Sequence, residues 1–396
     1  MNLKIFTDNI EEKALEQIRN LLAQPAFSEC KVRIMPDVHA GAGCVIGFTA
    51  NLGDKVIPNV VGVDIGCGML TTSLGKIDID FDKLDQVIRK RIPSGQNVHD
   101  NIRFKYNEAN SLICDRYLKN RDWLERSMGT LGGGNHFIEI DQGEGGNKYL
   151  VIHTGSRNLG KQVADFYQNV AIERINGCKA EFKSKINQAI RELKEQGREK
   201  EIEQTIKEIR KSYAKTEKMP NELCYLVGID RLNYLNDMWI CQCFATRNRN
   251  TIADIICEEM GWPIVDRFET IHNYIEVETG IIRKGAISAK KSEKVIVPIN
   301  MRDGCIIGIG KGNEDWNFSA PHGAGRIMSR IEAKKKVSMV DYKNSMKGIF
   351  TTSVSEDTLD ECPMAYKPMD EIIKNIEPTI EIQEIIKPIY NFKAGE

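Results

Sequence analysis

Residues 180–218 read AEFKSKINQAIRELKEQGREKEIEQTIKEIRKSYAKTEK, a run in which charged residues and strong helix formers predominate. Gly197 interrupts this run near its middle, where one helix can end and a turn can form. The pattern predicts a helical hairpin within residues 176–219, with its charges on a solvated face. The flanking sequence is rich in apolar, β-branched residues, so we expect the hairpin to be inserted into a β-rich body.

Short strands are predicted on both sides of the hairpin. The runs before it are apolar and separated by glycine turns: Cys30–Met35, Gly43–Thr49, Val60–Ile65, Phe137–Ile140 and Tyr149–Ile152. Residues 80–128 and 231–247 are helical in character, and another helix is expected at residues 324–338. Further strands are expected after the hairpin, at Tyr274–Val277, Val295–Pro298 and Cys305–Ile309. No linker divides the chain, so we predict a single α+β domain over residues 1–396, with a central active-site cleft and a helical insertion at about residues 165–250.

The composition leaves the class of partner open. Hydrophobic residues make up 41% of the 396 residues, which is ample for a large core. Lys and Arg number 55 and Asp and Glu 56, so any nucleic-acid partner would need a local groove rather than an overall basic field. The first residues are charged and no long apolar run follows, so neither a signal peptide nor a membrane span is expected. The 11 cysteines form no CxxC pair, which favours reduced thiols and a cytoplasmic location.

Several motifs place metal-binding side chains at the ends of strand-like runs. Asp64 and Cys67 lie in VDIGCG, whose glycines allow a tight turn that brings carboxylate and thiol together. His136 lies in GGGNHFIE, His153 in IHTGSR, and His272 follows an isoleucine and precedes an asparagine. Each of these residues alone could be a turn cap or a buried structural residue. Together they suit a borderline divalent metal, and their wide spacing is typical of a catalytic site rather than a zinc finger.

A further motif, SAPHGAGR, contains His322 and ends at Arg326. The glycines are expected to lead directly into a helix over Arg326–Lys336, whose N-terminus would favour a phosphate. An imidazole at this point is a credible nucleophile, and Arg326 could stabilise the charge of a phosphoryl group. An idle histidine at a helix N-terminus is the alternative. In the GGGNHFIE motif, Glu139 could accept two hydrogen bonds from a guanine edge.

The order of these motifs resembles that of the RtcB family of RNA ligases. The matching segments are Met35–His39, Val63–Gly68, Gly134–Glu139, His153–Arg157, His272–Asn273, His322–Arg326 and Lys393. Each is short, but together they extend from about residue 33 to residue 395 in the family's order. The chain is therefore identified as a member of this family, in a divergent bacterial-type branch, and a single ligase domain is expected.

The resemblance implies a reaction and its cofactors. It implies two Mn²⁺ ions bridged by Cys67, with His136 and His153 completing one site and Asp64 and His272 the other. It implies that His322 attacks the α-phosphorus of GTP and carries GMP. The GMP then passes to the 3′-phosphate of an RNA, made from a 2′,3′-cyclic phosphate, and a 5′-hydroxyl end displaces it. RNA repair or tRNA splicing would be the purpose, with an archease-type activator as a candidate partner.

The resemblance also implies which residues bind the nucleotide: Asn135, His136, Phe137, Ile138, Glu139, His272, Asn273, His322, Gly323, Ala324, Gly325, Tyr366 and Lys393. Some positions depart from the family pattern. A loop that usually reads proline-glycine-serine-methionine-glycine-threonine is here Pro298, Ile299, Asn300, Met301, Arg302 and Asp303, and a later serine position holds Cys305. Of these, Pro298, Ile299, Asn300, Met301 and Cys305 are included among the expected nucleotide contacts.

The altered loop leaves two other functions open. One is a metal-dependent phosphoesterase that acts on RNA ends without joining them. The other is a non-catalytic module that binds RNA or a nucleotide. The charged hairpin has an alternative as well, since it could be an arm that contacts RNA instead of a solvated face.

Overall fold

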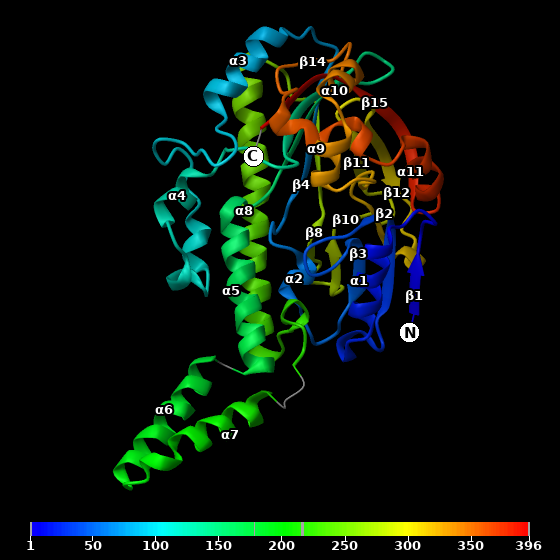
Figure 1. The fold of residues 1–396 in the computed structure, drawn as a ribbon. Coiled ribbons are helices and arrows are strands. Elements are labelled where there is room, and N and C mark those ends of the chain that lie inside the picture. The colour runs from blue at the N-terminus through cyan, green and yellow to red at the C-terminus, as the bar shows by residue number, and fades with distance from the viewer. Residues whose placement is uncertain (1, 178, 215–217, 395–396) are drawn as a thin grey trace.

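A curled antiparallel sheet forms the centre of the computed structural model, which describes residues 2–177, 179–214 and 218–394 (Figure 1). Its two edge strands, β7 and β11, approach each other, and an ion pair joins Asp266 on β7 to Lys294 on β11. The strand order is β11 (Lys294–Asn300), β12 (Gly304–Gly310), β15 (Ile380–Lys393), β5 (Phe137–Gln142), β6 (Lys148–Thr154), β4 (Gly68–Gly75) and β7 (Asp266–Ile271), with the short parallel β14 (Phe350–Thr351) beside β15. The curl gives the sheet an inner face on which side chains from many strands meet.

A second sheet carries the N-terminal part of the chain. Its order is β1 (Asn2–Ile5), β2 (Lys31–His39), β3 (Ile46–Asn51), β9 (Ile281–Lys284) and β8 (Asn273–Ile275). Helix α1 (Glu12–Leu22) buries Ala14, Ile18 and Leu21 in the same core as the buried residues of β2 and β3. Strands β10 (Ala286–Ser288) and β13 (Ser319–Pro321) form a two-stranded sheet, and β13 ends directly before His322 in the chain.

Two long helices, α5 (Arg157–Asn176) and α8 (Gly228–Met260), lie side by side beside the sheets (Figure 1). Between them along the chain, α6 (Lys179–Glu195) and α7 (Ile202–Ala214) project away from the body as a hairpin. Gly197 occupies the turn with φ +67°, a conformation that glycine adopts without strain. The predicted hairpin is therefore confirmed, apart from residues 178 and 215–217, which lie outside the described residues.

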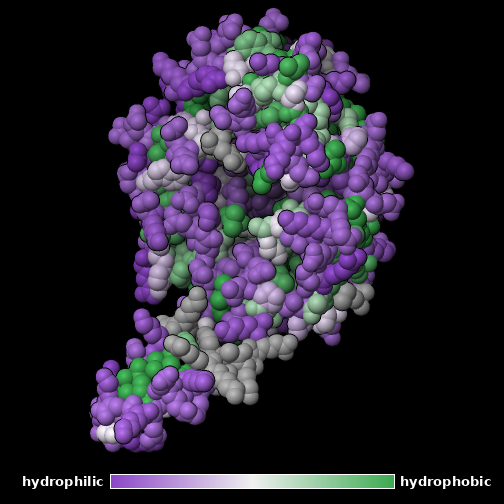
Figure 2. Space-filling model, in the orientation of Figure 1, coloured by the Kyte–Doolittle hydropathy of each residue, from purple (hydrophilic) through white to green (hydrophobic). Residues whose placement is uncertain are grey.

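Shorter helices complete the fold. They are α2 (Pro58–Val61), α3 (Phe81–Arg91), α4 (Arg121–Arg126), α9 (Arg330–Lys336), α10 (Met339–Ser345) and α11 (Met369–Ile376). Single 3-10 turns occur at Pro25–Phe27, Asn107–Ser111, Asp115–Tyr117, Glu199–Glu201, Asn221–Leu223, Glu314–Trp316, Glu356–Glu361 and Pro363–Ala365. No helix in the described ranges is both long and apolar enough to cross a bilayer. The face drawn in Figure 2 is mostly hydrophilic and is hollowed near its centre.

The α+β class is confirmed, and two predicted elements are wrong. Val60–Ile65 is not a strand: Pro58 takes the first turn of α2, which ends at Val61, and Gly62 with φ +107° then reverses the chain. The helix expected from Arg326 begins only at Arg330, where Ser329 forms a capping box with Glu332. In both cases local capping and turn residues, rather than the pattern of apolar residues, determine where the helix begins or ends.

Candidate active site and metal centre

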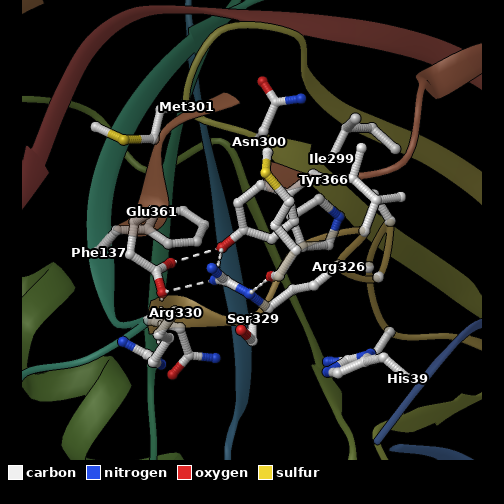
Figure 3. A pocket seen from close by; sticks show the side chains of 18 of the residues that line it. His39, Phe137, Ile299, Asn300, Met301, Arg326, Ser329, Arg330, Glu361 and Tyr366 are labelled. Carbon is white, nitrogen blue, oxygen red and sulfur yellow. Dashed lines mark hydrogen bonds and ion pairs between the residues drawn. The ribbon is translucent and has the colours of Figure 1, made fainter. Parts of the chain in front are cut away.

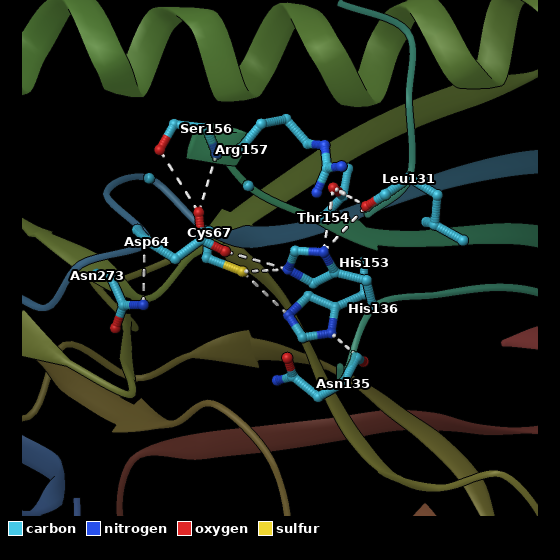
Figure 4. A network of polar contacts seen from close by, with 12 residues as sticks. Asp64, Cys67, Leu131, Asn135, His136, His153, Thr154, Ser156, Arg157 and Asn273 are labelled. Atoms are coloured by element: carbon cyan, nitrogen blue, oxygen red, sulfur yellow. Dashed lines mark hydrogen bonds and ion pairs between the residues drawn. The ribbon is translucent and has the colours of Figure 1, made fainter. Parts of the chain in front are cut away.

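Five side chains that could bind a metal, those of Asp64, Cys67, His136, His153 and His272, meet at the ends of strands in the central sheet. Figure 4 shows Asp64, Cys67, His136 and His153 among them. Cys67 Sγ lies 3.3 Å from His153 Nε2 and 3.5 Å from His136 Nε2. His136 Nε2 lies 3.1 Å from Asp64 Oδ2, and His153 Nε2 lies 3.5 Å from His272 Nε2. Cys67 precedes β4, which pairs with β6 on one side and β7 on the other, so the pairing itself brings Cys67, His153 and His272 together.

Backbone carbonyl groups hold two of the histidines in the orientation that metal binding needs. His136 Nδ1 donates to the carbonyl oxygen of Leu131 at 2.9 Å, and His153 Nδ1 donates to that of Asn135 at 3.1 Å. A proton on Nδ1 leaves the lone pair of Nε2 free, and both Nε2 atoms face the cluster. The two rings are therefore arranged as ligands before any ion binds.

The electrostatics of the cluster favour a cation. Burial raises the pKa of the Cys67 thiol well above its usual range, and so does the nearby Asp64 carboxylate. Burial lowers the pKa of His153 and His272, which keeps both rings neutral and able to act as ligands. His272 Nδ1 has no hydrogen-bond partner among the described residues. A thiol, three imidazoles and a carboxylate that converge in this way fit a divalent transition metal.

The structure groups the candidate ligands around Cys67 in a different way from the predicted assignment to two metal sites. Ligand atoms of Asp64, Cys67 and His136 lie within 4.8 Å of one another, and so do those of Cys67, His153 and His272. Cys67 belongs to both groups, as expected of a bridging ligand. His136 and His153 fall into different groups because His136 reaches the cluster from the loop before β5, on the Asp64 side, whereas His153 comes from β6.

Two neighbouring residues of α8 clamp the loops that carry these ligands. Arg249 Nη1 donates to the carbonyl oxygens of Gly66 at 2.8 Å and Thr154 at 2.6 Å. Asn248 Oδ1 accepts from the backbone N–H of Gly129 at 2.7 Å, and its Nδ2 donates to the carbonyl of Gly155 at 3.3 Å. Neither residue was predicted, although a fully buried arginine in a helix is itself a signal of a specific partner.

His322 is oriented by a buried carboxylate that the motif alone did not identify. His322 Nδ1 lies 2.6 Å from Asp37 Oδ2, which also accepts from the backbone N–H of His322 at 3.1 Å and of Gly323 at 3.3 Å. Asp37 is fully buried near the C-terminal end of β2. A proton on Nδ1, donated to Asp37, leaves Nε2 with a free lone pair. The ring centroids of His322 and His272 are 4.7 Å apart, so the nucleophile candidate adjoins the metal-binding cluster.

The prediction that His322 lies at the N-terminus of a helix is wrong. His322 follows β13, and α9 begins eight positions later at Arg330. Arg326 is not free for a phosphate: its guanidinium donates to Glu361 Oε1 at 3.1 Å and to Tyr366 Oη at 3.3 Å.

A cavity of about 710 Å³ adjoins His322 (Figure 3). Most of the predicted nucleotide-binding residues line it: Asn135, Phe137, Glu139, Pro298, Ile299, Asn300, Met301, Cys305, His322, Gly323, Ala324, Gly325, Tyr366 and Lys393. Its volume lies within the range of small-molecule sites. His136 and His272 do not line it and belong to the metal-binding cluster instead.

Besides His136 and His272, two further predicted nucleotide contacts, Ile138 and Asn273, do not line this cavity. The Ile138 side chain is fully buried in the hydrophobic core that α3 and α8 share, because residues alternate between the two faces of β5. Asn273 is used for structure: its Nδ2 donates to the carbonyl of Asp64 at 3.2 Å, and its Oδ1 accepts from the backbone N–H of Gly285 at 3.1 Å. Asn300 lines the cavity, but its Oδ1 accepts from the N–H groups of its own turn, at Arg302 and Asp303, both at 3.0 Å.

The Glu361 carboxylate at the cavity wall forms ion pairs with Arg326, Arg330 and Lys393 (Figure 3). The sequence did not predict this residue as part of the site. Its carboxylate accepts from Lys393 Nζ at 2.6 Å, Tyr366 Oη at 2.6 Å and Arg326 Nη1 at 3.1 Å, and it pairs with Arg330 Nη2 at 3.1 Å. Burial opposes the ionisation of Glu361, but the charges of Lys393, Arg330 and Arg326 outweigh this effect and lower the pKa of Glu361 to about 2. Lys393 and Tyr366 are thus held in place at the cavity by one anion.

Comparison with known proteins gives a consistent result. The family model described as tRNA-splicing ligase RtcB matches residues 17–123 and 115–394. The chain is 29% identical over 437 aligned residues to the RNA-splicing ligase RtcB of Escherichia coli (strain K12), covering 99% of this chain and 97% of that protein. It is 27% identical over 465 aligned residues to the tRNA-splicing ligase RtcB of Nanoarchaeum equitans (strain Kin4-M), covering 94% and 89%. The alignment with the bacterial protein is the more complete of the two.

Proposed function

The chain belongs to the RtcB family, which makes it an RNA ligase, and we propose that it joins RNA ends with GTP as co-substrate and two Mn²⁺ ions as cofactors. The RNA ends would be a 2′,3′-cyclic phosphate or 3′-phosphate and a 5′-hydroxyl. The observation that carries the proposal is the pairing of His322 with Asp37 beside both the metal-binding cluster and the cavity. A cytoplasmic location stays a prediction from the cysteine pattern, and an archease-type activator stays a prediction from the resemblance.

Asp37 supports His322 as the residue that carries GMP. With Nδ1–H donated to Asp37, His322 Nε2 can attack the α-phosphorus of GTP. A P–N bond forms as the P–O bond to pyrophosphate breaks. The imidazole then carries a positive charge, and the Asp37 carboxylate at 2.6 Å stabilises that charge without taking the proton.

Asp64, Cys67, His136, His153 and His272 would hold the metal ions, with Cys67 shared between them. The set of thiolate, imidazole and carboxylate ligands suits manganese among other borderline metals. When bound, the ions would neutralise phosphate charge and so favour in-line displacement at phosphorus. Cys67 must lose its proton on binding, which the ions compensate.

The later steps use the same residues. Once the cyclic phosphate is hydrolysed to a 3′-phosphate, an oxygen of that phosphate attacks the phosphorus on His322. The P–N bond breaks and His322 returns to its neutral form, still donating to Asp37. The RNA 5′-hydroxyl then attacks the activated 3′-phosphate, GMP leaves, and a 3′,5′-phosphodiester remains.

Covalent labelling tests this proposal. Wild-type protein is incubated with α-labelled GTP and Mn²⁺ and separated under denaturing conditions, with His322→Ala and His99→Ala as matched histidine variants. His99 is buried, is bonded to the carbonyl of Gly129 and is not a member of the cluster. We expect label on wild type and on His99→Ala but not on His322→Ala. Unlabelled wild type, or a labelled His322→Ala protein, would refute the role of His322.

The phosphoesterase remains the second candidate, because the Asn300 side chain is used within its own turn and Cys305 is buried. An RNA with 2′,3′-cyclic phosphate and 5′-hydroxyl ends separates the two functions. Joined product that depends on GTP supports the ligase. Opened ends without joined product, at saturating GTP and Mn²⁺, would support the phosphoesterase.

A further inference from the structure

Lys367 is a buried lysine that the mechanism above does not use. It follows Tyr366 in the chain, is only 2% exposed and does not line the cavity itself. Its Nζ donates to the carbonyl oxygen of Asn9 at 2.7 Å and to that of Pro36 at 2.8 Å. Glu371 Oε1 lies 3.8 Å away, beyond hydrogen-bond distance. Burying an ammonium group costs free energy that these bonds offset only in part, so Lys367 is a candidate for a functional role.

The carbonyl of Pro36 connects Lys367 to the carboxylate that orients His322. Pro36 immediately precedes Asp37 on β2, so a bond to its carbonyl fixes the peptide group next to the Asp37 side chain. Asp37 Oδ2 takes three bonds from His322 and Gly323, whereas Oδ1 is buried without a hydrogen-bond partner among the described residues. The carboxylate is thus held only by the loop that it has to orient, and its independent support must come through its backbone.

The main chain of Lys367 supports the loop that follows His322. The backbone N–H of Lys367 donates to the carbonyl oxygen of Gly325 at 3.0 Å. Gly325 has φ +76°, and a Cβ added to it would lie 2.3 Å from the carbonyl oxygen of Asp37. The loop therefore packs directly on β2 at this point. Lys367 contacts both the loop after His322 and the peptide before Asp37.

The charge of Lys367 also favours an ionised Asp37. In the part of the chain that the structure describes, Asp37 forms no ion pair with a lysine or arginine, and its ion-pair partner is His322. Burial lowers the pKa of Lys367, while the nearby carboxylates of Glu371 and Asp37 oppose this effect and favour the ammonium form. A cation that a carboxylate stabilises favours the ionised carboxylate in return. His322 needs this negative charge on the acceptor of its Nδ1 proton.

We propose that Lys367 is a positioning residue that fixes Asp37 relative to His322. Its main chain holds one partner of the pair, and its ammonium group holds the other. Lys367 neither lines the cavity nor belongs to the metal-binding cluster, so it acts on the reaction through Asp37. The inference rests on the proposed attack of His322 on GTP.

Histidine tautomers test the proposal without catalysis. In protein with isotope-labelled histidine, proton–nitrogen correlation spectra at mildly alkaline pH distinguish a proton on Nδ1 from one on Nε2, and His322→Ala identifies the signals of His322. We expect the His322 proton on Nδ1 in wild type. Lys367→Met keeps the length of the side chain but removes its N–H groups and its charge, so the signals should shift towards a mixture of both tautomers. Unchanged His322 signals in this variant would overturn the proposal.

Single-turnover labelling with GTP measures the effect on the reaction. Lys367→Met should lower the rate about 10- to 100-fold, because a small displacement of the reacting group is costly. The GTP concentration for half-maximal rate should stay close to that of wild type, since Lys367 does not line the cavity. In an Asp37→Asn background the same substitution should have almost no further effect, because Lys367 acts through the Asp37 carboxylate. Effects that multiply in the double variant would contradict this coupling.

Lys284→Met is the matched control. Lys284 is another buried lysine whose Nζ donates to two backbone carbonyls, those of Ala42 at 2.6 Å and Asn59 at 2.8 Å. This variant should lose a similar amount of stability in urea unfolding but keep the wild-type signals of His322. The same shift of His322 signals in Lys284→Met would refute a specific role of Lys367.

Two further comparisons keep the test decisive. If Lys367→Met does not fold, Lys367→Gln replaces it, since the amide keeps an N–H donor but has no charge; unmoved His322 signals in that variant would also overturn the proposal. A wild type that takes up no label from GTP would refute the proposed function. The tautomer comparison would still test Lys367 in that case, because it uses the protein without nucleotide.

Discussion

At the scale of single residues, Asp37 determines how His322 can react. The carboxylate is fully buried and takes three hydrogen bonds on one oxygen, all from His322 and Gly323. The histidine is thus presented by a partner 285 positions away in the chain, on a different strand. A carboxylate in this place both fixes the ring and favours its positive charge.

Asp37→Asn should lower the rate of guanylylation by about 100-fold or more, because the amide keeps the shape but removes the charge that stabilises the imidazolium. We expect kcat to fall while the KM for GTP changes little, since Asp37 does not line the cavity. Single-turnover labelling with GTP measures the rate, and metal analysis of the same protein serves as a control. A variant that labels at the wild-type rate would contradict the role of Asp37.

Glu361 makes stability depend on pH at the acid end. Its folded pKa of about 2 lies below its ordinary value of 4.5. A depressed pKa stabilises the folded state above pH 4.5, and this contribution of roughly 3 kcal/mol is lost as the pH falls towards 2. Glu361→Gln removes it at every pH. Urea unfolding should therefore show a large difference between wild type and variant at neutral pH that shrinks on acidification; two parallel stability curves would contradict the assignment.

At the scale of elements, α8 supports the metal centre from behind. Arg249 and Asn248 bond the backbone of four loop residues next to the ligands: Gly66, Gly129, Thr130 and Gly155, and Arg249 also bonds Thr154. The loops are rich in glycine and would otherwise be free to move. The helix thus acts as a rigid support for a site that the strand ends assemble.

Arg249→Lys should reduce manganese affinity by about tenfold, because lysine keeps the charge but cannot bond the carbonyls of Gly66 and Thr154 with one nitrogen while a second nitrogen holds Glu269. Arg247→Lys is the matched control, as Arg247 is exposed two positions earlier on the same helix. Manganese titration of both variants gives the comparison. Equal affinity in the two variants would show that the clamp does not position the ligands.

The elements also show what sequence patterns can predict. The candidate metal ligands and His322 were predicted because each lies in a short motif at the end of an apolar run, and the structure brings these side chains together. The division of the ligands could not be predicted, since it depends on how β4 pairs with β6 and β7. Asp37 and Glu361 were missed for the same reason: their partners are distant in the chain. The prediction of a strand at Val60–Ile65 was wrong because its β-branched residues favour a strand, whereas Pro58 and Gly62 produce a short helix and a turn.

At the scale of the whole molecule, the hairpin of α6 and α7 stands apart from the catalytic body (Figure 1). Its two ends lie side by side, because Asn176 donates to the carbonyl of Met219 at 2.8 Å and accepts from its N–H at 3.0 Å. The hairpin can therefore be removed without separating the elements on either side.

Replacing residues 179–217 with a short glycine linker should leave manganese content and guanylylation close to wild type, since none of the cluster or cavity residues lies in the hairpin. If the charges only form a solvated face, RNA joining is also unchanged. The measurement is ligation rate at several RNA concentrations. A higher KM for RNA with normal guanylylation would instead identify the hairpin as an RNA-contacting arm.

The place of β15 affects how the protein is made. This strand follows every other described strand along the chain, yet it lies inside the sheet, between β12 and β5. During translation the edges of β12 and β5 therefore stay open until β15 has emerged from the ribosome, and such edges invite pairing with other chains. Asn391 and Lys393 arrive with β15, so the wall of the cavity that they form is missing until this strand has been translated.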